Sequence, residues 1–134
     1  MCSSDLTWER ESTDEVVERV ERSGGDARAR IRRAGVLTFS NARLLPIDLA
    51  VRDWARRDEA VAERLRRVDG RRMGLLRELI GSFCTDPDEV EARSLLAFCL
   101  AIGEHFLAAG HGDRTRAEVL ARAGDLVLGG PDAP

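Results

Sequence analysis

The apolar residues of this sequence recur with the period of an α-helix over nearly its whole length. The clearest stripe, at spacings of three and four residues, is formed by Val61, Leu65, Val68, Arg72, Leu76, Leu79 and Phe83. Residues at these spacings lie on one face of a helix, and another element must cover that face. No run alternates apolar and polar residues between turn residues, as a half-buried strand does. The sequence therefore predicts an all-α fold.

Glycine, proline and capping residues divide this pattern into about six helices, which we expect to form a single bundle. The predicted helices cover residues 13–22, 27–40, 46–55, 58–83, 90–109 and 116–128. Asp58 and Asp86 are predicted N-caps, and Pro87 suits a first helical turn. The helix over 90–109 is apolar on nearly every face, which predicts that it is buried on both sides.

A chain of 134 residues fits one domain. Its first six residues, MCSSDL, resemble the translated end of a common sequencing adapter, so we predict that residues 1–6 are non-native and that the gene was cut at this point; the alternative is a native polar N-terminal tail. The predicted domain covers residues 7–128, and residues 129–134 are a predicted tail.

Charged residues make up 34% of the chain but nearly cancel, at a formal net charge of -3. The chain therefore lacks the basic excess that binding to nucleic-acid phosphates requires. All 21 basic residues are arginine, and lysine, tyrosine and glutamine are absent, a bias that a GC-rich bacterial genome produces. No targeting segment or membrane span is evident, which favours a cytoplasmic protein with no membrane partner.

The sequence shows no catalytic or metal-binding signature. Cys84, Cys99, His105 and His111 match no short-spaced ligand pattern, and no Gly-x-Ser-x-Gly elbow is present. The odd number of cysteines, with Cys2 the third, favours reduced thiols, and Cys84 and Cys99 are predicted to be buried. We therefore expect no enzyme activity, no metal and no cofactor.

The charge-dense stretch over residues 50–73 is mostly a predicted solvated face, because its acidic residues balance many of its arginines at helical spacing. Arg52, Asp69 and Arg72 differ, since they lie near the apolar stripes of their helices. Two interpretations stay open for them: a structural ion pair between helices, or contact with an acidic ligand. Trp54 on the same stretch is predicted to point inward.

This stretch resembles the C-terminal regulatory domain of TetR/AcrR-family bacterial transcriptional regulators. The similarity covers about residues 7–128 and is most specific at Arg52, Trp54, Ala55 and Asp58, then at Val68, Asp69 and Arg72. The family's N-terminal helix-turn-helix domain has no counterpart here, so the expectation is a truncated regulator that would bind DNA only through that missing domain.

The resemblance implies a small hydrophobic effector inside the bundle and a homodimer. The ligand-binding candidates are Leu37, Phe39, Trp54, Met73, Leu76, Phe98 and Ile102. Two apolar C-terminal helices in a small domain also favour a dimer through those helices. The dimer candidates are Leu96, Leu100, Gly103, Leu107, Leu120, Ala123 and Val127.

The alternative is a free-standing all-α protein-interaction module, an adaptor or an antitoxin-like partner, without an effector pocket. An enclosed apolar cavity favours the regulator, and its absence favours the interaction module.

Overall fold

The computed structural model describes residues 3–40 and 43–129, so Cys2 and all of the predicted tail except Gly129 lie outside the described residues. Over these residues the chain is helical, and the all-α prediction is confirmed for them; one isolated bridge joins His111 and Arg114. The helices are α1 (Ser3–Ser12), α2 (Asp14–Ser23), α3 (Ala27–Phe39), α4 (Leu44–Ala55), α5 (Glu59–Gly81), α6 (Pro87–Gly103) and α7 (Arg116–Leu128). None of these helices is long and apolar enough to cross a membrane.

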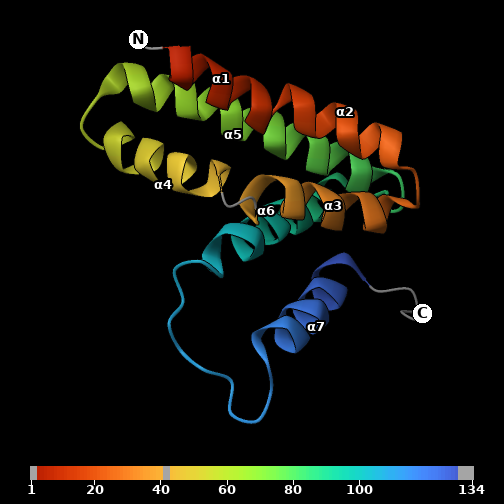
Figure 1. The fold of residues 1–134 in the computed structure, drawn as a ribbon. Helices are drawn as coiled ribbons and strands as arrows, with labels where there is room; N and C mark the ends of the chain where they lie inside the picture. Colours follow the sequence, from red (N-terminus) through yellow and green to blue (C-terminus); the bar gives the residue numbers. More distant parts are fainter. Residues whose placement is uncertain (1–2, 41–42, 130–134) are drawn as a thin grey trace.

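The longest helix, α5, packs against α3, α4 and α6. Figure 1 shows α1 and α2 following one another along one side of the bundle, with α3 and α4 along another. Helix α7 lies at the outside, where it packs on α6 after a long loop. The bundle therefore has a central helix, and its outermost helix is α7.

Helix starts follow the local chemistry of the sequence. The Asp58 carboxylate accepts hydrogen bonds from the amides of Ala60 and Val61, at 2.9 and 3.2 Å. Asp86 caps α6 in the same way, as predicted. Thr115 starts α7 with a capping box that the sequence analysis did not identify. A side-chain oxygen at such a position satisfies an amide that has no partner inside the helix.

A break at Thr13 separates α1 from α2, and the sequence did not predict α1 as a helix of its own. Thr13 occupies the N-cap position of α2 but makes no capping bond. Its hydroxyl instead donates to the Glu9 carbonyl at 2.7 Å. Helix α1 is held to the bundle by Trp8, whose side chain is 1% exposed.

Helix α6 ends at Gly103, and the prediction that it continues to residue 109 is wrong. The guanidinium of Arg116 donates to the carbonyl oxygens of Glu104, Leu107 and Ala109 at 2.9 to 3.0 Å. These carbonyls are therefore satisfied by a side chain rather than by a further turn of helix. A contact from the next helix, which the local sequence pattern does not contain, thus stabilises the end of α6.

Two apolar clusters form the core. The larger cluster consists of Val16, Val20, Ile31, Ala34, Leu76, Leu79, Ile80, Cys84 and Leu128, and the smaller of Trp8, Leu44, Val51 and Val68. Arg72 lies between Val68 and Leu76 on the buried stripe of α5. A charged side chain therefore sits where the two clusters meet.

Candidate functional site

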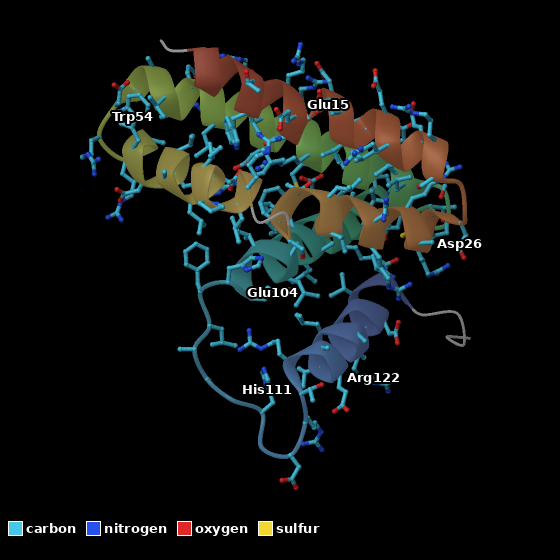
Figure 2. All side chains as sticks on the ribbon, viewed as in Figure 1. Glu15, Asp26, Trp54, Glu104, His111 and Arg122 are labelled. Carbon is cyan, nitrogen blue, oxygen red and sulfur yellow. The ribbon has the colours of Figure 1, made fainter. Side chains whose placement is uncertain are left out.

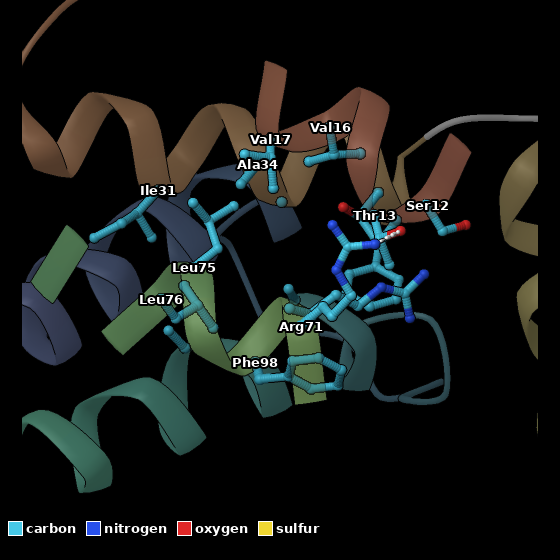
Figure 3. A pocket seen from close by; sticks show the side chains of 16 residues that line it. Ser12, Thr13, Val16, Val17, Ile31, Ala34, Arg71, Leu75, Leu76 and Phe98 are labelled. Atoms are coloured by element: carbon cyan, nitrogen blue, oxygen red, sulfur yellow. Dashed lines mark hydrogen bonds between the residues drawn. The ribbon is translucent and has the colours of Figure 1, made fainter. Parts of the chain in front are cut away.

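An apolar pocket opens between the α1–α2 junction, α3, α5 and α6, and we call it the bundle pocket (Figure 3). Its volume is about 60 Å³. The residues that line it are Ser12, Thr13, Val16, Val17, Ile31, Ala34, Gly35, Thr38, Phe39, Arg71, Arg72, Leu75, Leu76, Ala97, Phe98 and Ala101. Apolar side chains form most of the wall, as in sites for small molecules.

Three of the predicted ligand-binding residues, Phe39, Leu76 and Phe98, line the bundle pocket. The rings of Phe39 and Phe98 meet edge to face, with centroids 5.6 Å apart. This geometry is favourable for aromatic pairs and fixes both rings in the wall. The structure thus brings together side chains from α3, α5 and α6 that are far apart in the sequence.

The other four predicted ligand-binding residues do not line this pocket. Leu37 and Met73 pack against the larger apolar cluster, and Ile102 is only partly buried. The prediction that Trp54 points inward is wrong, because its side chain is 42% exposed at the far end of α4 (Figure 2). Helix α4 turns Arg52 toward α5, and residues two apart lie roughly 200° apart around a helix, which directs Trp54 to the surface.

The polar part of the pocket wall combines the α1–α2 junction with α5. Figure 3 shows Ser12, Thr13 and Arg71 gathered at one end of the pocket, with Ile31 at the other. The Arg71 guanidinium donates to the Thr13 hydroxyl at 3.0 Å and forms an ion pair with Asp14. These contacts were not predicted, because in the sequence Thr13 is only the first residue of a predicted helix and Arg71 only part of the predicted solvated face.

Arg52, Asp69 and Arg72 form the predicted type of ion pair between helices, together with Asp48. We call these four residues the ion cluster. Arg52 binds the Asp69 carboxylate with two nitrogens, at 2.7 and 2.8 Å. Arg72 donates to Asp69 at 3.1 Å, and its Nη2 lies 2.8 Å from Asp48 Oδ1 without the alignment of a hydrogen bond. The cluster joins α4 to α5 through two positive and two negative side chains.

Asp48 is the most deeply buried member of the ion cluster, at 1% exposed. It accepts a hydrogen bond from Arg52 Nε at 2.9 Å. Burial lowers the pKa of Arg52, but the hydrogen bonds and charges of Asp69 and Asp48 outweigh this effect and raise it overall. Asp48 was visible in the sequence only as a partner four residues before Arg52, a spacing that does not distinguish a buried pair from an exposed one.

The guanidinium of Arg72 also lies over two aromatic rings. Its Cζ is 5.1 Å from the centroid of Phe39 and 5.8 Å from that of Trp8. Such contacts are attractive because the ring face is negative. Since Arg72 and Phe39 both line the bundle pocket, the ion cluster and the pocket share a wall.

A second apolar hollow, the outer groove, lies between α3, α6 and α7 and measures about 290 Å³. Four residues line both the groove and the bundle pocket: Ile31, Gly35, Ala97 and Ala101. A Cβ atom placed on Gly35 would lie 4.0 Å from the Ala101 Cβ. Three of the four residues that separate the two hollows are therefore small.

The predicted dimer residues divide into three groups. Leu96 and Leu107 are exposed, at 53% and 54%. Leu100, Leu120 and Val127 line the outer groove, and Gly103 and Ala123 are partly buried. The prediction that α6 is buried on both sides is wrong for the single chain, because only Ser94 of this helix is buried. The helix rests on the bundle with one face and leaves the other uncovered.

Exposed apolar side chains that the sequence analysis did not single out extend this uncovered surface. Leu95 on α6, Phe106 after it and Leu126 on α7 are 55%, 66% and 73% exposed. Exposed apolar patches, where they are contiguous, are typical of surfaces that contact a protein, a membrane or a ligand.

The cysteines and histidines form no metal site or thiol nucleophile that the structure shows. Within residues 3–40 and 43–129, no group of three His, Cys, Asp or Glu side chains is placed to hold a metal ion. The pKa of the Cys84 thiol is raised, most of all by its hydrogen bond to Glu89 and next by burial. Cys99 is exposed, so the prediction that both cysteines are buried is wrong for Cys99.

Comparison with known proteins found no match: no protein-family model, no curated protein sequence and no solved structure is significantly similar to this chain.

Proposed function

We propose that this chain is the ligand-sensing and dimerisation part of a TetR-like bacterial transcriptional regulator. The observation that carries the proposal is the bundle pocket, an apolar hollow lined by four parts of an all-helical bundle. In this proposal a small hydrophobic effector binds there in the cytoplasm, and DNA binding belongs to an N-terminal domain that this chain does not contain.

The position of α1 supports a sensing role. Ser12 and Thr13, at the junction of α1 and α2, form part of the pocket wall. An effector in the pocket therefore contacts the start of the path that leads along α1 toward the N-terminus. A ligand shifts an equilibrium between two arrangements only if it binds one of them more tightly. Contacts at a helix junction supply such a difference, because the angle between α1 and α2 changes them.

The uncovered apolar face supports a homodimer. Leu95, Leu96, Phe106, Leu107 and Leu126 all lie on α6, on α7 or in the loop between them, and each is more than half exposed. A two-fold dimer buries the same patch on both copies. We therefore propose α6 and α7 as the dimer contact.

Sedimentation velocity and ligand-induced stabilisation test the two parts of the proposal. We expect a dimer at micromolar concentration that Leu96→Glu converts to a monomer. Trp54→Glu, at an exposed apolar residue on the far end of α4, is the matched control and is expected to stay dimeric. A monomeric wild-type protein refutes the dimer.

For the pocket, we expect small apolar compounds to raise the unfolding temperature by mass action. Ala34→Phe fills the pocket from α3 and is expected to abolish this rise, whereas Trp54→Glu leaves it unchanged. Circular dichroism of each variant without ligand confirms that it is folded. Stabilisation that persists in a folded Ala34→Phe protein refutes the pocket as the binding site.

The size of the pocket favours a second candidate, the all-α interaction module that acts as an adaptor or antitoxin-like partner. A volume of about 60 Å³ is well below the roughly 300–1,000 Å³ of sites for drug-sized ligands. A protein that no small compound stabilises, and that stays monomeric until a different protein covers α6, fits this candidate instead.

A further inference from the structure

We propose that the occupant of the bundle pocket is a small, electrically neutral, apolar molecule with one carbonyl oxygen, and that Arg71 and Arg72 donate hydrogen bonds to this oxygen. The inference rests on the proposed sensing function and adds the chemical class of the ligand. Three features of the pocket carry it: its donors, its charge balance and its size.

The hydrogen-bond donors of Arg72 favour an acceptor on the ligand. The Arg72 side chain is 7% exposed and lines the pocket, yet its Nε finds no hydrogen-bond partner among the described residues. Its two terminal nitrogens already face Asp69 and Asp48. A buried N–H without an acceptor is unfavourable, so an acceptor supplied by a ligand is favoured there. Guanidinium groups only donate, which makes the polar end of the ligand an acceptor.

Arg71, which precedes Arg72 on α5 and also lines the pocket, supplies a second donor. Its Nη1 already donates to the Thr13 hydroxyl at 3.0 Å, which holds the guanidinium beside the α1–α2 junction (Figure 3). The opposite end of the pocket, around Ile31 and Leu76, is apolar. A molecule with one oxygen and an otherwise hydrocarbon body matches this division.

The charge balance favours a neutral ligand over a carboxylate. In the ion cluster, Arg52 and Arg72 are balanced by Asp48 and Asp69. Arg71 is balanced by Asp14. No positive charge at this end of the pocket is therefore left over for an anion, and a buried anion without its own counter-charge is strongly disfavoured. A carbonyl oxygen accepts the same hydrogen bonds without adding a charge.

The size limits the body of the molecule. A volume of about 60 Å³ is only a few times the roughly 10–15 Å³ that a cavity needs to hold one water molecule. A ligand of about six heavy atoms fits at this scale, and a longer molecule has to displace Gly35 or Ala101 to reach the outer groove.

Cyclopentanone, methylenecyclopentane and isobutyrate, a carboxylate that also has about six heavy atoms, test this inference, with dissociation constants measured by NMR titration of the protein. The first two have the same shape, but only the ketone carries an acceptor. A pocket without donors prefers the alkene, because desolvating a carbonyl is costly. We expect the wild-type protein to bind the ketone at least as tightly as the alkene, and both more tightly than the carboxylate.

Arg71→Met is expected to shift the ketone-to-alkene preference about tenfold toward the alkene, the size of effect that one hydrogen bond to a charged donor produces. Arg77→Met removes an exposed arginine of the same helix, which is paired with Glu91 outside the pocket, and is expected to leave the preference unchanged. Arg72→Met combined with Asp48→Leu removes the second donor without unbalancing the charge, and is expected to shift the preference in the same direction.

Each of the other possible results overturns one part of the inference. Alkene preference in the wild type, with no change in the arginine variants, overturns the donor role but leaves an apolar sensing pocket. Tighter binding of the carboxylate overturns the neutral class. If none of the three compounds, nor any other small apolar compound, shifts resonances of the pocket residues, the proposed function fails as well.

Discussion

Replacing Asp48 by leucine is expected to destabilise the protein strongly, because Asp48 is the most deeply buried member of the ion cluster. Asp48 is 1% exposed and faces both Arg52 Nε at 2.9 Å and Arg72 Nη2 at 2.8 Å. Removing one partner from a buried pair costs about 3–5 kcal/mol, because the other charge stays buried without compensation. The unfolding entropy of a 134-residue domain is about 0.28 kcal/mol per degree. The expected fall in Tm is therefore roughly 10–18 °C.

A double-mutant cycle measures whether this cost comes from the unpaired charge. Asp48→Leu and Arg72→Met are each expected to lose about 3–5 kcal/mol. Their combination leaves Arg52 paired with Asp69, and replacing a buried pair by apolar residues is often close to neutral. We expect the double variant to recover at least about 2 kcal/mol relative to either single variant in urea unfolding.

The control is Asp53→Ala. Asp53 lies on α4, as Asp48 does, and forms an exposed ion pair with Arg57. Its loss is expected to lower the free energy of unfolding by less than about 1 kcal/mol. Additive losses in the double variant, or a cost for Asp48→Leu no larger than that of Asp53→Ala, refute the reasoning.

Three further outcomes follow from contacts outside the ion cluster. Cys99 is exposed and Cys84 has a raised pKa, so in a Cys2→Ser background Cys99 is expected to react with a thiol reagent at pH 8 much faster than Cys84; equal rates contradict this. Arg116→Ala is expected to lower the free energy of unfolding by about 1–3 kcal/mol and to accelerate amide hydrogen exchange across residues 104–115. Unchanged exchange would show that Arg116 does not hold this segment in place. The pKa of Glu91 is lowered from its ordinary value of 4.5, first by the hydrogen bond and then by the charge of Arg77 on α5. The ion pair therefore stabilises the fold above pH 4.5, and this stabilisation is lost as the pH falls through the lowered pKa. Wild-type protein should therefore lose more stability between about pH 5 and pH 3 than Glu91→Gln, and identical acid profiles would contradict this.

Local signals were enough to predict most of the fold. Asp58 and Asp86 cap helices as their positions in the sequence indicate. The two errors of helix boundary have tertiary causes. The separate α1 depends on the burial of Trp8, and the early end of α6 depends on Arg116, which binds carbonyls that precede it by 7 to 12 residues. Neither contact falls within the three- and four-residue spacings that helical periodicity measures.

The candidate site was less predictable, for a related reason. The sequence identifies Arg72 as a candidate because it interrupts an apolar stripe, and the structure places it in the ion cluster. Asp48 lies on no such stripe, and its burial depends on how far α4 is rotated. The same rotation exposes Trp54, whose place in the helical spacing of the apolar residues favoured the interior. The direction that a helix face takes within the bundle is set by the ion pairs between helices, and these depend on both partners at once.

Arg72 connects the two features that the bundle combines. Its terminal nitrogens face Asp48 and Asp69, which joins α4 to α5, while the residue also lines the bundle pocket and its Nε has no hydrogen-bond partner among the described residues. A ligand acceptor that aligns with Nε favours the arrangement in which the guanidinium faces both carboxylates. Ligand binding and the packing of α4 on α5 are then coupled through one rigid, planar group. Because this coupling is reciprocal, a change that weakens the ion cluster must also weaken a ligand bound to Nε, even when it leaves every apolar residue of the pocket in place.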